Sequence, residues 1–194
     1  MRRRLLASLT VVMSAPLLAS PQPTINFQLE HYLVSGASTD ELERSIFEST
    51  PVFISGRRYG AVTKNEFATS YAAVGTSEGG CEVRNVKVLL NSTVILPKLA
   101  PGRYSGALLA EWQRYIGALT AHEMQHANNG KYTAETLAKR LYNFKAPIPC
   151  SQMKPKLDQA LDRLVKNMGH WDLELDRQTA HGATQGATLK KGVK

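Results

Sequence analysis

Apolar and polar residues alternate over several short stretches in the first half of the chain. Phe27, Leu29, His31 and Leu33 occupy every second position, and this period of two predicts a strand over residues 26–34. Further extended segments are predicted over residues 52–54, 60–74, 81–90 and 93–96. Pro97 is expected to end the last of them, because proline cannot donate to a strand ladder.

The second half of the chain changes to helical spacing. Large apolar residues return every three or four positions from Ser105 to about Asn128, which predicts the strongest helix, and Gly130 is expected to end it. Shorter helices are predicted after Ser38, over residues 133–142 and from Ser151 to residue 168, with irregular structure from 169 to 194. Strands followed by helices predict an α+β fold, with a small antiparallel or mixed sheet packed on the strongest helix and the helices after it.

The first nineteen residues have the pattern of a secretory signal peptide. Arg2, Arg3 and Arg4 precede an apolar stretch that ends near the small residue Ala19. We therefore expect cleavage, export to the periplasm or the medium, and no stable membrane span afterwards. Residues 20–188 are expected to form one domain, followed by a basic tail over residues 189–194.

Charge and composition exclude several classes of protein. The net charge is +8, but three of the 24 basic residues lie in the leader, which lowers the charge of the remainder to +5. The other basic residues are scattered, so we expect no nucleic-acid partner. A hydrophobic fraction of 43% excludes a disordered chain.

The two cysteines are expected to pair. The chain has an even number of cysteines, Cys81 and Cys150, and its leader predicts export to a compartment in which disulfides form and persist. Neither belongs to a CxxC pair, which argues against a cysteine-rich zinc site.

The sequence His122-Glu123-Met124-Gln125-His126 is an HExxH motif on the strongest predicted helix. Residues four apart lie on one helix face, so His122 and His126 can direct nitrogens at a single Zn²⁺. Glu123 can take a proton from a zinc-bound water as general base, which is the chemistry of a peptidase.

A catalytic zinc needs a third protein ligand and an open position for water. Asn129 and Tyr132 stand where an HExxHxxGxxH motif would have its glycine and third histidine, so the third ligand must come from elsewhere. Spacing ranks His181 first, then Glu174, then Asp176, with little separation, and Asp172 is a further acidic candidate.

Two further residues are candidates for supporting roles. Asp176 could accept the second N–H of a ligating histidine, and Tyr132 could donate to a developing oxyanion. A solvated carboxylate and a tyrosine in the core or at the rim are the alternatives.

The chain resembles a bacterial family of predicted secreted zinc-dependent proteases, classed as domain of unknown function 922. The resemblance covers essentially all of residues 20–194 and rests on an ordered set of motifs: residues 32–36, Cys81, residues 95–97, 112–115 and 121–126, Cys150, residues 176–182, and Gly186-Ala187. It implies a zincin-like fold, one zinc ion held by His122, His126 and His181, and Glu123 as general base. An aromatic residue often precedes the Asp-x-x-Thr-x-His-Gly segment in that family, whereas Leu175 precedes Asp176 here.

The motif, the leader and the resemblance together predict an exported zinc metallohydrolase that cleaves peptide bonds in a peptide or protein substrate. The alternatives are a zinc-binding envelope protein without hydrolytic activity, and a basic surface-binding module in which HExxH is accidental.

Overall fold

The structure is a computed structural model that describes residues 22–194. The predicted signal peptide lies outside these residues. The elements are β1 (Thr24–Val34), α1 (Thr39–Ser49), β2 (Phe53–Ile54), β3 (Arg57–Arg58), β4 (Val62–Gly75), β5 (Cys81–Leu99), α2 (Gly106–Leu141), β6 (Lys145–Ala146), α3 (Cys150–Thr179) and the 3-10 turn η1 (Ala183–Gln185). The fold is α+β with a mixed sheet, as the element order predicts.

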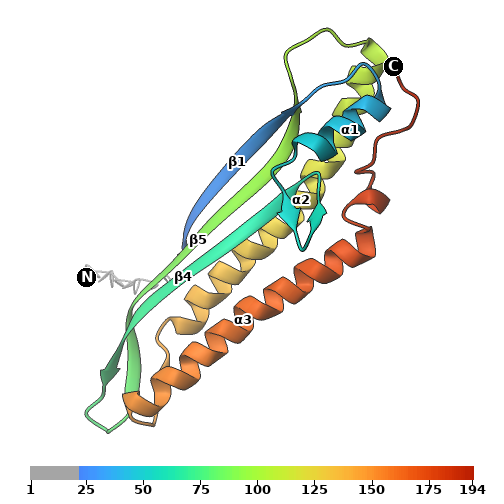
Figure 1. Cartoon of the computed structure of the whole chain (residues 1–194). Coiled ribbons are helices and arrows are strands. Elements are labelled where there is room, and N and C mark those ends of the chain that lie inside the picture. Colours follow the sequence, from blue (N-terminus) through green and yellow to red (C-terminus); the bar gives the residue numbers. More distant parts are fainter. Residues whose placement is uncertain (1–21) are drawn as a thin grey trace, which may run out of the picture.

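The main sheet has the strand order β1-β5-β4, with β6 paired to the start of β5. β1 runs parallel to β5, and β4 runs antiparallel to it. Figure 1 shows an elongated molecule in which α2 runs along one face of this sheet and α3 lies beside α2. The small β2–β3 hairpin stands next to α1 (Figure 1).

Two hydrophobic cores divide the molecule along α2. The disulfide core joins the start of β5, the end of α2 and the start of α3, and its largest members include Leu90, Leu137, Leu141 and Met153. The cleft core joins α1, the end of β5 and the first half of α2, and it includes Leu42, Leu96, Leu108, Trp112 and Tyr115.

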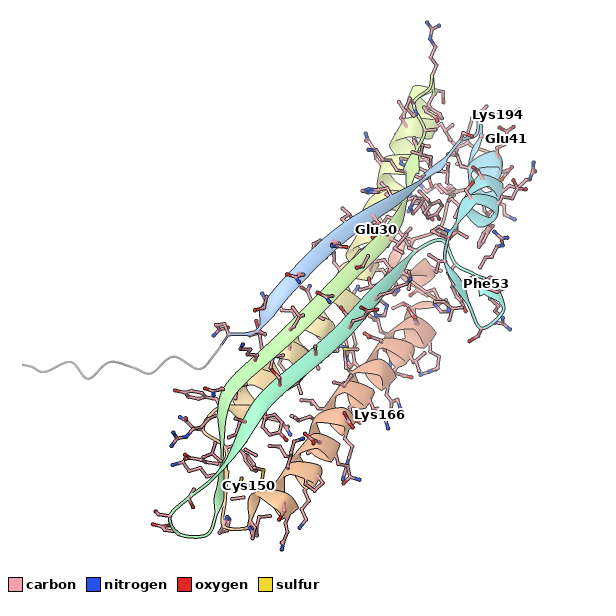
Figure 2. All side chains as sticks on the ribbon, turned by 60° about the vertical axis from the view of Figure 1, so that its left-hand side comes forward. Glu30, Glu41, Phe53, Cys150, Lys166 and Lys194 are labelled. Carbon is pink, nitrogen blue, oxygen red and sulfur yellow. A yellow bond between two sulfur atoms is a disulfide. The ribbon has the colours of Figure 1, made fainter. Side chains whose placement is uncertain are left out.

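The disulfide predicted from the sequence is present. Cys81 at the start of β5 and Cys150 at the start of α3 are bonded, which closes a loop of 69 residues. Figure 2 places Cys150 at the end of the molecule opposite to Lys194.

The structure confirms the predicted first strand and first helix. Ser38 caps α1 by accepting a hydrogen bond from the backbone N–H of Glu41. The irregularity predicted near Asn85 is a register shift between β4 and β5, where Asn85 has a φ of 54°.

Three predicted boundaries are wrong. β5 is one strand that continues through Pro97, because β4 pairs with β5 only as far as Ile95 and a strand with a single partner tolerates proline. α2 is one helix that continues through Gly130, and α3 continues through Gly169 to Thr179. The residues expected to be irregular therefore include the last third of a long helix.

The segment predicted as a basic tail is attached to the cleft end of the molecule. The backbone N–H of Lys190 donates to the Glu111 carboxylate at 2.8 Å. Thr39 and Val193 also exchange hydrogen bonds, so the chain end lies beside α1. Within residues 22–194, no helix combines the length and apolar character that a membrane span requires.

Candidate metal centre

His122 and His126 lie one turn apart on α2, as the motif spacing predicts. Both side chains are buried between α2 and α3. Their Nε2 atoms are 3.4 Å apart. The helix therefore directs two imidazole nitrogens at one point.

Asp176 on α3 supplies a third atom at this point. Its Oδ1 lies 3.0 Å from His122 Nε2 and 3.1 Å from His126 Nε2. Three atoms that bind one tetrahedral zinc ion at about 2.0–2.1 Å would be about 3.3 Å from one another. His122, His126 and Asp176 therefore form a group whose spacing fits a metal ion.

The outer nitrogens of the two histidines fix their tautomers. His122 Nδ1 lies 2.9 Å from Gln185 Oε1, and His126 Nδ1 lies 2.9 Å from Asp172 Oδ1. Both oxygens are acceptors, so both Nδ1 atoms donate, and in a neutral imidazole the Nε2 atom is then an acceptor. Two nitrogen lone pairs and a carboxylate oxygen converge, an arrangement that requires positive charge at its centre.

The pKa values of the two histidines and Asp176 also indicate that this point favours positive charge. The hydrogen bond to Asp176 raises the pKa of His122. Burial alone would lower the pKa of His126, but hydrogen bonds to Asp172 and Asp176 outweigh it and raise this pKa to about 10. Burial would raise the pKa of Asp176, whereas its bonds to the two histidines hold it well below its usual range.

Glu123 is buried beside the group of three. Thr63 on β4 donates to Glu123 Oε2 at 2.8 Å and also to the backbone oxygen of the same residue at 2.9 Å. Burial raises the pKa of Glu123, and the Thr63 hydrogen bond opposes this only in part. The carboxylate is thereby held in place with an increased affinity for a proton.

β4 also fixes the second half of the motif. Asn65 Nδ2 donates to the backbone oxygen of His126 at 2.9 Å. The Asn65 side chain lies directly over Gly130, where an added Cβ would be 2.4 Å from Asn65 Oδ1. Glycine at this position therefore permits the close contact between β4 and α2.

The end of α3 turns sharply around His122. Ala180, His181 and Gly182 all have positive φ, so the chain makes a left-handed turn at once after the helix. A Cβ on Gly182 would lie 2.9 Å from His122 Cγ, which only glycine avoids. This turn brings Gln185 into hydrogen-bond contact with His122. The Asp-x-x-Thr-x-His-Gly segment therefore forms the turn that packs against His122.

The structure places the other predicted site residues differently. His181 lies at the edge of the site, with Nδ1 3.4 Å from Asp176 Oδ2 and its ring against Tyr59, and it is not part of the converging group. Glu174 is exposed and paired with Arg177, which lowers its pKa to about 2. Tyr132 is 68% exposed and does not line the cavity beside the group.

Sequence reasoning missed Gln185, Thr63 and Asn65 as supporting residues. Asp172 and Asp176 carried a usable signal, since residues four apart share one helix face. That signal was hidden by the expectation that the chain becomes irregular after residue 168.

A cavity of about 530 Å³ opens beside the converging group. α1, the β2–β3 hairpin, the first residues of β4, α3 and the residues after η1 all contribute to its walls. His122, Glu123, His126 and Asp176 line it, so the four side chains are accessible from one space.

The fold and this site define an α+β protein with a candidate metal centre of two histidines and one aspartate. The chain matches the family described as "Bacterial protein of unknown function (DUF922)" over residues 29–182 and belongs to it. No curated protein matches the chain, and neither does any solved structure.

Proposed function

We propose that this protein is an exported zinc-dependent hydrolase of peptide bonds with a zincin-like arrangement of its site. The observation that carries the proposal is the convergence of His122 Nε2, His126 Nε2 and Asp176 Oδ1 beside the buried Glu123 carboxylate. Two imidazoles and one carboxylate, with an open side toward a cavity, are the donor set of a catalytic zinc site.

A zinc ion held by these residues would polarise a substrate carbonyl and lower the pKa of a water molecule. Glu123 is the general base of the proposal, because it lines the same cavity and its raised pKa favours accepting a proton. Thr63 holds its carboxylate in one orientation. The same carboxylate can then release that proton to the leaving nitrogen.

The second coordination layer supports this assignment. Gln185 and Asp172 orient the two imidazoles, which is the usual role of partners behind a ligating histidine. The proposal replaces His181 by Asp176 as third ligand. Export is part of the proposal as well, since a disulfide is typical of oxidising compartments.

The test uses zinc analysis together with hydrolysis of a mixture of quenched fluorescent peptides. Wild-type protein is expected to bind about one zinc ion per chain. Glu123→Gln should keep the metal and lose at least about 100-fold in turnover, because it removes the base. Glu135→Gln is the matched control, as Glu135 is an exposed residue of the same helix.

Two results would contradict the proposal. Wild-type protein that cannot take up zinc would remove the metal centre. Bound zinc with equal hydrolysis by wild type and Glu123→Gln would leave a zinc-binding protein without this mechanism.

A further inference from the structure

The cavity beside the metal centre has an apolar wall built from three separate elements. Phe47 of α1, Ile54 of β2 and Leu173 of α3 line it and are 46%, 45% and 69% exposed. Buried Ile46 and Leu119 line the same cavity. Large exposed apolar side chains gathered around one cavity are typical of a binding site.

The position of this wall is fixed by hydrogen bonds. Arg58, at the end of the hairpin, donates to the backbone oxygens of Phe47 at 3.2 Å and Glu48 at 3.1 Å. The backbone N–H of Tyr59 donates to the oxygen of Val52 at 3.1 Å. The hairpin and α1 therefore form one unit that holds Phe47 and Ile54 beside the site.

The charges at this end of the cavity do not favour a charged ligand. Arg58 and Glu43 both line it, and their opposite charges give no net preference. The Arg58 guanidinium already binds two backbone carbonyls of α1. Apolar contact is the recognition chemistry that this wall offers.

The neighbouring strand indicates what kind of molecule carries the apolar group. β4 is an edge strand of the main sheet in residues 22–194, and Ala61, Val62 and Thr63 line the cavity where it begins. An extended peptide can add to an edge strand through its backbone and direct alternate side chains toward one wall. An acyl chain has no backbone donors or acceptors to use this edge.

We infer that the cavity binds an extended peptide segment and accepts one large apolar side chain, such as Leu, Phe or Met, against Phe47, Ile54 and Leu173. The statement that this side chain stands next to the bond to be cleaved rests on the proposed function. The binding preference itself does not require turnover.

The experiment measures peptide binding by the full mature chain carrying Glu123→Gln, using titration calorimetry with zinc present. The probes are three N-acetylated, C-amidated alanine hexapeptides with Leu, Ala or Asp at the fourth position. The Leu peptide is expected to bind at least about tenfold more tightly than the other two, the effect of burying most of one leucine side chain.

Substitutions in the wall identify the binding surface. Ile54→Ser and Leu173→Ser should each weaken binding of the Leu peptide about threefold to tenfold and leave the Ala peptide unchanged. Phe53→Ser is the matched control, because Phe53 is the adjacent hairpin residue, is 67% exposed and does not line the cavity. Figure 2 labels Phe53 on this hairpin.

Equal affinity for the three peptides, or no binding by any of them at millimolar concentration, would overturn the inference. So would Ile54→Ser and Leu173→Ser proteins that behave like Phe53→Ser. Repeating the titration after zinc removal separates the two proposals. A preference for Leu in a protein that binds no zinc would overturn only the proposed function, whereas bound zinc without the preference would overturn only this inference.

Discussion

The two ends of the molecule place the same helix, α2, in different environments. At the disulfide end, α2 contributes Ala134, Leu137 and Leu141 to an apolar core that a covalent bond closes. At the cleft end, the same helix buries Glu111 and the ionisable residues of the HExxH motif. Burying these groups is costly unless partners compensate. The contrast indicates that the first end stabilises the fold, while the second uses part of that stability to keep ionisable groups buried together.

The largest expected effect comes from opening the disulfide end. Replacing Cys81 and Cys150 together by alanine removes a link across 69 residues, which should lower the free energy of unfolding by about 4 kcal/mol. Urea denaturation of the zinc-loaded protein measures this loss. The comparison further predicts that zinc affinity stays within about twofold. A parallel loss of zinc affinity would show that the two ends are not separable.

The next effect concerns Asp176, the proposed third ligand at the cleft end. Asp176→Asn should weaken zinc binding by more than the roughly 100-fold that loss of an outer partner costs, and Asp172→Asn by roughly 10- to 100-fold. His181→Ala should change it only a few-fold, because His181 lies outside the converging group. Competition with a fluorescent zinc chelator gives all three affinities. Loss of zinc in His181→Ala with retention in Asp176→Asn would reverse the assignment.

A smaller effect is expected at Gly130, where the two cores meet along α2. Gly130→Ala places a methyl group against the Asn65 side chain and should lower the free energy of unfolding by about 1–3 kcal/mol. It also displaces Asn65 from the backbone oxygen of His126, so zinc affinity should fall too. Denaturation and zinc titration of the same protein measure both effects.

The double variant decides whether this contact is the cause. Asn65→Ala removes the three atoms nearest to the added methyl group, and alanine gains up to about 1 kcal/mol of helix propensity over glycine. The second substitution should therefore be neutral or stabilising. Equal destabilisation in both backgrounds would exclude Asn65 as the reason for glycine.

Gly130 also shows what local patterns could and could not predict. The order of elements, the cap at Ser38, the disulfide and the two motif histidines follow from short-range rules, and the structure agrees with them. The predicted end of α2 is wrong because glycine often ends a helix. Here Gly130 instead permits a close contact with Asn65 of β4, which lies 65 residues earlier in the sequence.

The same reason explains why spacing ranked His181 above Asp176, although the structure brings Asp176 to the two histidines. Asp172 and Asp176 share one helix face only because α3 continues to Thr179. α3 packs along α2 over that stretch, and single-sequence periodicity does not report such packing. The convergence of Asp176 with the two histidines therefore depends on tertiary contacts that spacing around HExxH cannot reveal.

The smallest effect tests Glu111, a buried carboxylate of α2 that lies outside the HExxH motif. Glu111 accepts two hydrogen bonds from Arg114 and one from the backbone N–H of Lys190, so it links α2 to the C-terminal segment. The Arg114 bonds lower the pKa of Glu111 to about 2. A lowered pKa stabilises the folded state above about pH 4.5, and this contribution is lost as the pH falls toward 2.

Glu111→Gln should therefore cost about 1 kcal/mol at pH 7 and progressively less between pH 4.5 and 2. Denaturation monitored through tryptophan fluorescence in a Trp171→Phe background, where only Trp112 of the cleft core remains, follows this end of the molecule. Glu174→Gln provides the contrast, because Glu174 forms the same kind of pair with Arg177 on an exposed surface. It should leave stability unchanged at every pH, since an exposed pair is already well solvated. A loss at Glu111 that did not diminish in acid would mean that its packing, rather than its charge, holds the C-terminal segment to the cleft end.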